Sequence, residues 1–161
     1  MDLRFLPNCN NKPFSSRGAF LSMHAQDLED PDSTRFWNTK LPAKIRFFGW
    51  LLYHDRLNTR ANLGAKNIRP LEACYCENCP DMLETDTHLF LLCPRATSVW
   101  SRLDIAITIG AHRMPWVLGC SLPLPDDVRM DVMLLLCWHI WKARNAKIFD
   151  QHDLTSCEVL R

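Results

Sequence analysis

The sequence is poor in glycine, with five in 161 residues, and it has no phosphate-binding glycine motif. It contains no G-x-G-x-x-G, no P-loop and no G-x-S-x-G, the turns on which dinucleotide-binding folds, P-loop NTPases and α/β-hydrolases depend. It also lacks a YxDD-type carboxylate pair of the kind that holds two metal ions in a polymerase. A Cys137–His139 pair would point apart on a helix, because residues i and i+2 do not face each other. We therefore expect a protein that is not an enzyme and has no small-molecule substrate.

Long apolar runs are also missing. The most apolar one, Val132–Trp141, has ten residues, whereas a membrane-spanning helix needs about 20, so we expect no membrane association. The first 20 residues have no apolar segment of a secretory signal. We expect an intracellular protein, in the nucleus or cytoplasm. Residues 3–26 carry three bases and no acid, which faintly resembles a transit peptide, so organelle import stays an alternative.

Charge is nearly balanced overall, at +1, and the net value does not indicate a nucleic-acid binder. Its distribution is uneven: residues 40–70 carry seven bases and one acid, and residues 71–90 carry five acids and no base. If the protein binds RNA or DNA, we expect contacts from the basic segment, through Lys44, Arg46, Arg56 and Arg60. The alternative is a solvated basic face that the acidic segment partly neutralises.

Cysteine is abundant, with eight residues, and three of them fall within six positions at Cys74, Cys76 and Cys79. In a reducing compartment, clustered cysteines indicate metal ligands. Cys76, Cys79, His88 and Cys93 form the pattern C-x2-C-x8-H-x4-C. Three thiolates and one imidazole complete a tetrahedral zinc shell with no open position, which is typical of a structural site. The spacing therefore predicts one structural zinc ion, with Cys74 as an alternative to Cys76 for the first ligand.

His88 and Cys93 raise a geometric question, because five residues on a continuous α-helix turn through about 140°. The two side chains can converge only if the helix ends between them. Pro94 disfavours helical geometry at Cys93. We therefore expect the helix that begins near Thr85 to stop at this point.

Apolar spacing predicts a mainly α fold: a small helical domain with one zinc site in a Cys-x2-Cys loop and the following helix. Helices are expected after Pro42, after an N-cap at Thr59, from 85 to 92, from about 95 to 107, and over Asp126–Phe149. The expected organisation is a weakly ordered tail (1–30), a zinc-binding domain (31–110), a Pro-containing connection (111–125), an apolar C-terminal helix (126–150) and a tail (151–161).

The segments FW…LPAKIRFFGWLL, RLNTRANL, CENC and HLFLLCPRATSVW lie between Phe36 and Trp100. Together they resemble the zinc-binding domain of plant LINE-type (non-LTR) reverse transcriptases, and WHIWKARNAKIF at 138–149 resembles the segment that often follows. In that family the CxxC pair, the His of the HLF motif and the next Cys are taken as the zinc ligands. The resemblance thus implies Cys76, Cys79, His88 and Cys93.

The resemblance also implies an accessory domain with a role in nucleic-acid or partner binding. Polymerase and RNase H neighbours are not in the sequence, so we expect a retroelement-derived fragment or a standalone copy. The alternative function is a structural or protein-interaction domain. In that case we expect a partner to dock on an exposed apolar face of the C-terminal helix, around Trp138 and Trp141.

Overall fold

The computed structural model describes residues 30–152, so most of the predicted tails at 1–30 and 151–161 lies outside the described residues. By packing, the chain divides into residues 1–35 and 36–161, and the description below concerns the second unit. The elements are α2 (Pro31–Asn38), α3 (Ala43–Tyr53), α4 (Arg60–Ala65), η1 (Leu71–Ala73), β1 (Tyr75–Cys76), β2 (Cys79–Leu83), η2 (His88–Leu92), α5 (Pro94–Arg102), η3 (Ala111–Arg113), α6 (Pro115–Leu118) and α7 (Asp126–Phe149). The fold is mainly α, as predicted.

Three predicted helices form where the sequence signals placed them. Helix α3 begins directly after Pro42 and buries Ile45, Phe48 and Leu52, the stripe expected at helical spacing. Helix α4 is capped by Thr59, whose side chain accepts a hydrogen bond from the backbone N–H of Asn62 at 3.2 Å. Helix α7 spans Asp126–Phe149, the predicted bounds.

Two segments differ from expectation. Helix α5 ends at Arg102 rather than near 107, because the chain turns at Asp104, which has a left-handed φ of 53°. The predicted connection at 111–125 contains η3 and α6. Both elements are short, and Pro115 starts the second of them, a first-turn position that proline favours.

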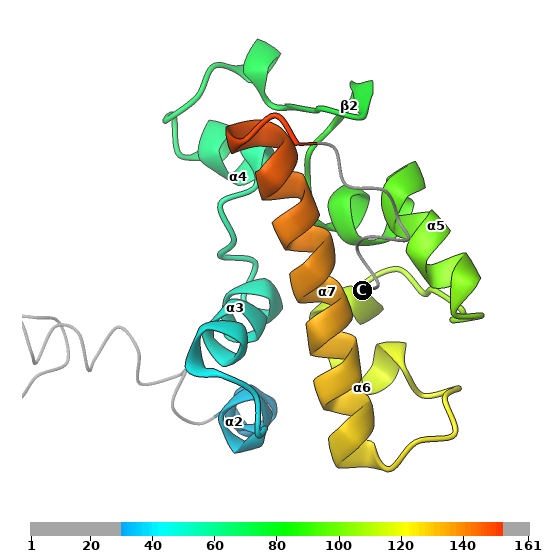
Figure 1. The fold of residues 1–161 in the computed structure, drawn as a ribbon. Helices are drawn as coiled ribbons and strands as arrows, with labels where there is room; N and C mark the ends of the chain where they lie inside the picture. Colours follow the sequence, from blue (N-terminus) through cyan, green and yellow to red (C-terminus); the bar gives the residue numbers. More distant parts are fainter. Residues whose placement is uncertain (1–29, 153–161) are drawn as a thin grey trace, which may run out of the picture. The chain divides into compact units, whose positions relative to one another are not determined.

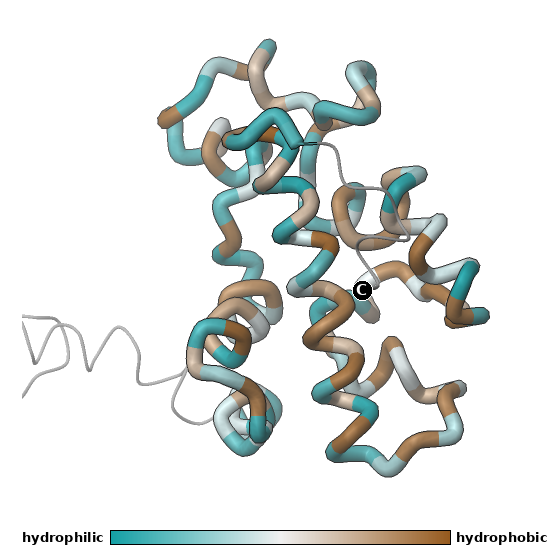
Figure 2. Tube along the Cα trace, in the orientation of Figure 1, coloured by the Kyte–Doolittle hydropathy of each residue, from teal (hydrophilic) through white to brown (hydrophobic). Residues whose placement is uncertain are grey.

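Helix α7 is the central element of this unit, and it packs against α3, α6 and η2 (Figure 1). Hydrophobic positions recur along α7, while hydrophilic ones gather where it ends beside α4 (Figure 2). Trp138 and Trp141 are half-buried and lie against Phe48 of α3, with ring centroids 5.3 and 6.3 Å away. Both tryptophans are therefore only partly exposed, and docking of a partner on this face stays a prediction. Within the described residues, no helix combines the length and hydropathy of a membrane span.

Gly49 of α3 is packed tightly against Leu134 of α7 and against Phe36. A Cβ added there would lie 2.6 Å from Leu134 Cδ2 and 2.8 Å from Phe36 Cδ1. We predict that Gly49→Ala lowers the free energy of unfolding by about 1–3 kcal/mol, although alanine is intrinsically the better helix former. Urea denaturation checks this, and a raised midpoint would contradict the close packing.

Candidate metal centre

Two of the predicted ligands lie on a β-hairpin. Strands β1 and β2 pair antiparallel, and Cys76 is directly opposite Cys79. Glu77 and Asn78 form the two-residue turn between them. This tight connection is what the two-residue gap of the CxxC motif predicts, because cross-strand partners bring their Cβ atoms within about 5 Å.

The other two ligands lie at the ends of a single π-turn. Residues His88–Leu92 form the π-helix η2, and the backbone N–H of Cys93 donates to the carbonyl of His88 at 2.6 Å. This i to i+5 bond brings the two residues together. Cys93 itself is extended, with φ −61° and ψ 132°, as expected before Pro94. The helix therefore ends as predicted, but the widened turn also produces the convergence. Such π-turns are frequent at functional sites.

The hairpin and the π-turn bring all four predicted ligands into one cluster. The Sγ atoms of Cys76, Cys79 and Cys93 and a ring nitrogen of His88 all lie within 4.8 Å of one another. Cys76, His88 and Cys93 are buried. Ligands of a tetrahedral zinc ion with Zn–S bonds of about 2.3 Å are about 3.8 Å apart, so the cluster has the size of a zinc shell.

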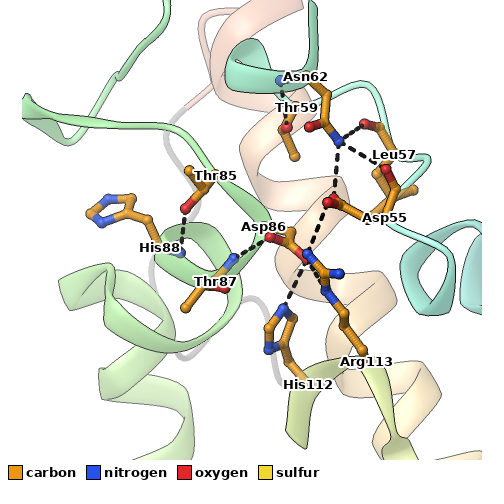
Figure 3. Close-up of polar contacts among 10 residues, drawn as sticks. All are labelled: Asp55, Leu57, Thr59, Asn62, Thr85, Asp86, Thr87, His88, His112 and Arg113. Atoms are coloured by element: carbon orange, nitrogen blue, oxygen red, sulfur yellow. Dashed lines mark hydrogen bonds and ion pairs between the residues drawn. The ribbon is translucent and has the colours of Figure 1, made fainter. Parts of the chain in front are cut away.

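His88 provides an independent test of the fit. Both of its ring nitrogens are buried, and neither has a hydrogen-bond partner among the described residues. A buried polar atom without a partner is costly, and a metal ion would satisfy one of the two. The neighbouring Thr85 hydroxyl accepts from the His88 backbone N–H at 3.0 Å, and the ring points away from Asp86 (Figure 3). The three sulfurs and this ring thus fit one zinc ion.

Cys74 lies outside this cluster. Its buried thiol donates to the carbonyl of Pro70 at 3.3 Å, and its sulfur packs against Gly64, where an added Cβ would come within 2.5 Å of it. The alternative of Cys74 as first ligand is therefore not supported by the geometry.

The sulfurs are close enough to share protons. A hydrogen bond with Cys93, followed by burial, raises the pKa of Cys76 well above its usual value. The same bond lowers the pKa of Cys93 to about 7. Burial raises the pKa of Cys79. Because zinc binds thiolates, loading this cluster must release protons.

Two buried carboxylates connect the segments around the cluster through ion pairs and hydrogen bonds, and neither was predicted from the sequence. We call these residues and their partners the frame. Glu84 is fully buried and pairs with Arg144 of α7, and it also accepts from the Arg60 backbone N–H at 2.9 Å. Asp86 accepts from the Arg113 Nε at 2.6 Å and lies 3.0 Å from the His112 Nε2 (Figure 3). The five acids of 71–90 are therefore not all part of a solvated acidic segment.

The polar network around Asp86 extends to exposed residues at the surface. Burial raises the pKa of Asp86, but the contacts with His112 and Arg113 lower it well below its usual value. Arg113 also pairs with Asp55 at 3.0 Å, which accepts a bond from Asn62 of α4 at 3.1 Å (Figure 3). These contacts connect the segment just before His88 to the residues that follow α3 and to η3, which precedes α6.

The four predicted nucleic-acid contacts occupy different environments. Lys44 and Arg56 are exposed, and the Arg56 guanidinium lies 5.2 Å from the Trp50 ring centroid. Arg46 donates to the carbonyl of Trp37 at 3.1 Å. Arg60 is largely buried and donates to the carbonyl of Tyr75 at 2.7 Å and to Glu77 at 3.1 Å. Arg60 is therefore engaged with the hairpin.

Comparison with known proteins agrees with this geometry. A family model described as zinc-binding in reverse transcriptase matches residues 14–100, a range that contains all four clustered ligands. The curated proteins and the solved structures gave no match. The family match covers more than half of the 161 residues, and the chain belongs to the family of zinc-binding domains of reverse transcriptases.

Proposed function

We propose that this chain is a non-catalytic module, stabilised by one zinc ion on Cys76, Cys79, His88 and Cys93, that binds single-stranded nucleic acid through the outer face of α3. The observation that carries the nucleic-acid part is Phe47, whose side chain is 51% exposed. It is stacked on Trp50, with 6.0 Å between ring centroids and 11° between planes. Surfaces that bind single-stranded nucleic acid combine exposed aromatic rings, which stack on nucleobases, with basic side chains.

Basic side chains flank this ring. Lys44 is three residues before Phe47, and Arg46 is its immediate neighbour, so the two bases lie on either side of the outer face of the helix. Arg56 follows the helix and lies over Trp50. Arg60 is bound to Tyr75 and Glu77 of the hairpin, so it is not part of this surface. The bases would contact phosphates while the ring stacks on a base.

The β1–β2 hairpin is poorly suited to contact nucleic acid. Glu72, Glu77 and Asp81 are exposed on η1, the hairpin turn and β2, and each would repel a phosphate. A zinc ion on three thiolates and one imidazole adds a formal charge of about −1. These charges favour the α3 face for any phosphate.

The non-catalytic part of the proposal rests on the ligand count. Four protein ligands complete a tetrahedral zinc shell and leave no position for water or substrate. Among the described thiols outside the cluster, Cys137 is fully buried, and burial raises its pKa to about 12, so it is a poor nucleophile.

A protein-interaction role is the second candidate. Ile68 and Leu71, between α4 and the hairpin, are 69% and 63% exposed. Two large apolar side chains so close in sequence can start a docking surface. Self-association or partner binding abolished by Ile68→Ser, with nucleic-acid affinity absent, would favour this reading.

We predict that Lys44→Glu together with Arg56→Glu weakens binding of a fluorescent 20-nucleotide single strand at low salt. Each lost phosphate contact lowers the slope of log affinity against log salt by about 0.7 in magnitude, so the pair should lower it by about 1.4. Fluorescence anisotropy across a salt series measures this. The matched control, Arg102→Glu with Lys142→Glu, changes two exposed bases off α3. Equal losses in both variants, or no binding by the wild type, would reject the α3 surface.

A further inference from the structure

A second basic feature lies away from α3, where α4 meets the end of α7. A cavity of about 330 Å³ opens there and is lined by three arginines, Arg60, Arg69 and Arg144, together with Trp141 and Phe149. Two asparagines also line it, and none of the described residues in its wall is acidic. We call it the arginine cavity.

The three guanidinium groups are held in place by contacts with neighbouring residues, most of which do not line the cavity. Arg144 is bound by Glu84 and lies over the Trp141 ring, 4.8 Å from its centroid. Arg60 is held by the Tyr75 carbonyl and Glu77. Arg69 donates to the Ala73 carbonyl at 3.2 Å. Because their geometry is already set, an anion bound here orders little side-chain freedom.

The local charge favours an anion. Glu84 pairs with Arg144 and Glu77 pairs with Arg60, whereas Arg69 donates to a backbone carbonyl. The three guanidinium groups and two carboxylates therefore leave one net positive charge. The Nε of Arg60 is buried and has no hydrogen-bond partner among the described residues. Guanidinium groups bind phosphate through paired N–H donors and stack on aromatic rings.

The cavity also has an apolar side. Phe149, the last residue of α7, is 73% exposed at its rim, and Leu63 and Ile148 complete the wall. A volume near 300 Å³ suits one small ligand rather than a length of strand. The wall therefore matches a compact molecule with an anionic group and a flat apolar one.

We propose that the arginine cavity binds the terminal phosphate of one nucleotide, with its base against Phe149. The nucleotide is either free or the phosphorylated 5′ end of a strand, and the strand-end form rests on the function proposed above. This site would distinguish strand ends, which the open α3 surface does not.

The test uses the full zinc-loaded chain and three probes: a ten-nucleotide oligo-dT with a 5′-phosphate, the same oligo with a 5′-hydroxyl, and dTMP. We expect the phosphorylated oligo to bind about tenfold more tightly than the hydroxyl form, and Arg69→Gln to abolish this ratio. Arg69 is chosen because Arg60 and Arg144 also hold the frame. Lys66→Gln, a nearby exposed base outside the cavity, should keep the ratio.

The outcomes separate the two proposals. Lys44→Glu with Arg56→Glu should weaken both oligos and leave the ratio unchanged. Binding of dTMP without either oligo supports the cavity and rejects the α3 surface. Equal binding of both oligos without dTMP binding overturns the cavity. If thermal melting shows that Arg69→Gln is unfolded, Phe149→Asp replaces it, and retention of the ratio in that variant also overturns the proposal.

Discussion

Replacing Cys76 by serine should remove the zinc ion and most of the cooperative unfolding transition of the chain. The four ligands join the hairpin to the π-turn, and η2 carries Leu89, Phe90 and Leu91 into the core. Structural zinc contributes about 10–16 kcal/mol of binding free energy in small zinc domains, comparable to the whole stability of a typical domain. Elemental analysis and urea denaturation of wild type and variant measure both effects.

The other cysteines provide matched controls. Cys120→Ser changes an exposed thiol, and Cys74→Ser changes a thiol next to the hairpin but outside the cluster. Both variants should keep one zinc per chain. Full zinc content in Cys76→Ser, or zinc loss in Cys74→Ser with the fold intact, would show that the ligand set is wrong.

Glu84→Gln should cost about 3–5 kcal/mol of unfolding free energy, the typical cost of removing one partner of a buried ion pair. Glu84 is 0% exposed, and its carboxylate binds both the Arg144 guanidinium and the backbone N–H of Arg60. Its carbonyl also accepts from the Ala61 N–H at 3.2 Å. The substitution would leave a buried guanidinium without its counter-charge. Urea denaturation of the zinc-loaded protein measures the loss.

A double variant tests whether the loss comes from the unpaired charge of Arg144 or from altered packing. Glu84→Gln with Arg144→Met removes both charges and should recover a large part of the loss, because burying neither ion avoids the desolvation penalty. Asp126→Asn is the control, since Asp126 is 93% exposed and pairs with Arg129 at the surface. It should change stability by less than about 1 kcal/mol. A Glu84→Gln effect as small as this would contradict a framework role for Glu84.

Local signals explain what could be predicted from the sequence. The C-x2-C spacing indicated a tight turn, and the structure has it between Cys76 and Cys79. Pro94 indicated a break at Cys93, which is extended. Thr59 indicated a helix start, and it caps α4. Each of these features depends on a residue and its neighbours within about five positions, where backbone sterics and hydrogen bonding decide the outcome.

Side chains far apart in the chain explain what could not be predicted. Glu84 and Arg144 are 60 positions apart, and Asp86 and His112 are 26 apart. Nothing in the local pattern of either acid distinguishes it from the exposed acids nearby. Only packing of α7 and η3 against the zinc-binding segment buries these carboxylates, and burial then requires a paired cation.

By itself the sequence determined the mainly α fold, a zinc cluster of three cysteines and His88 with Cys74 left as an alternative ligand, and the concentration of basic residues before it. These features follow from periodicity, spacing and composition. The tertiary structure decided that Cys74 is turned to Pro70, that Arg60 serves the frame, and that Trp138 and Trp141 are half-buried. It also placed Arg60, Arg69 and Arg144 around one cavity. These outcomes depend on which elements pack together, and packing between distant segments is a property of the whole folded chain.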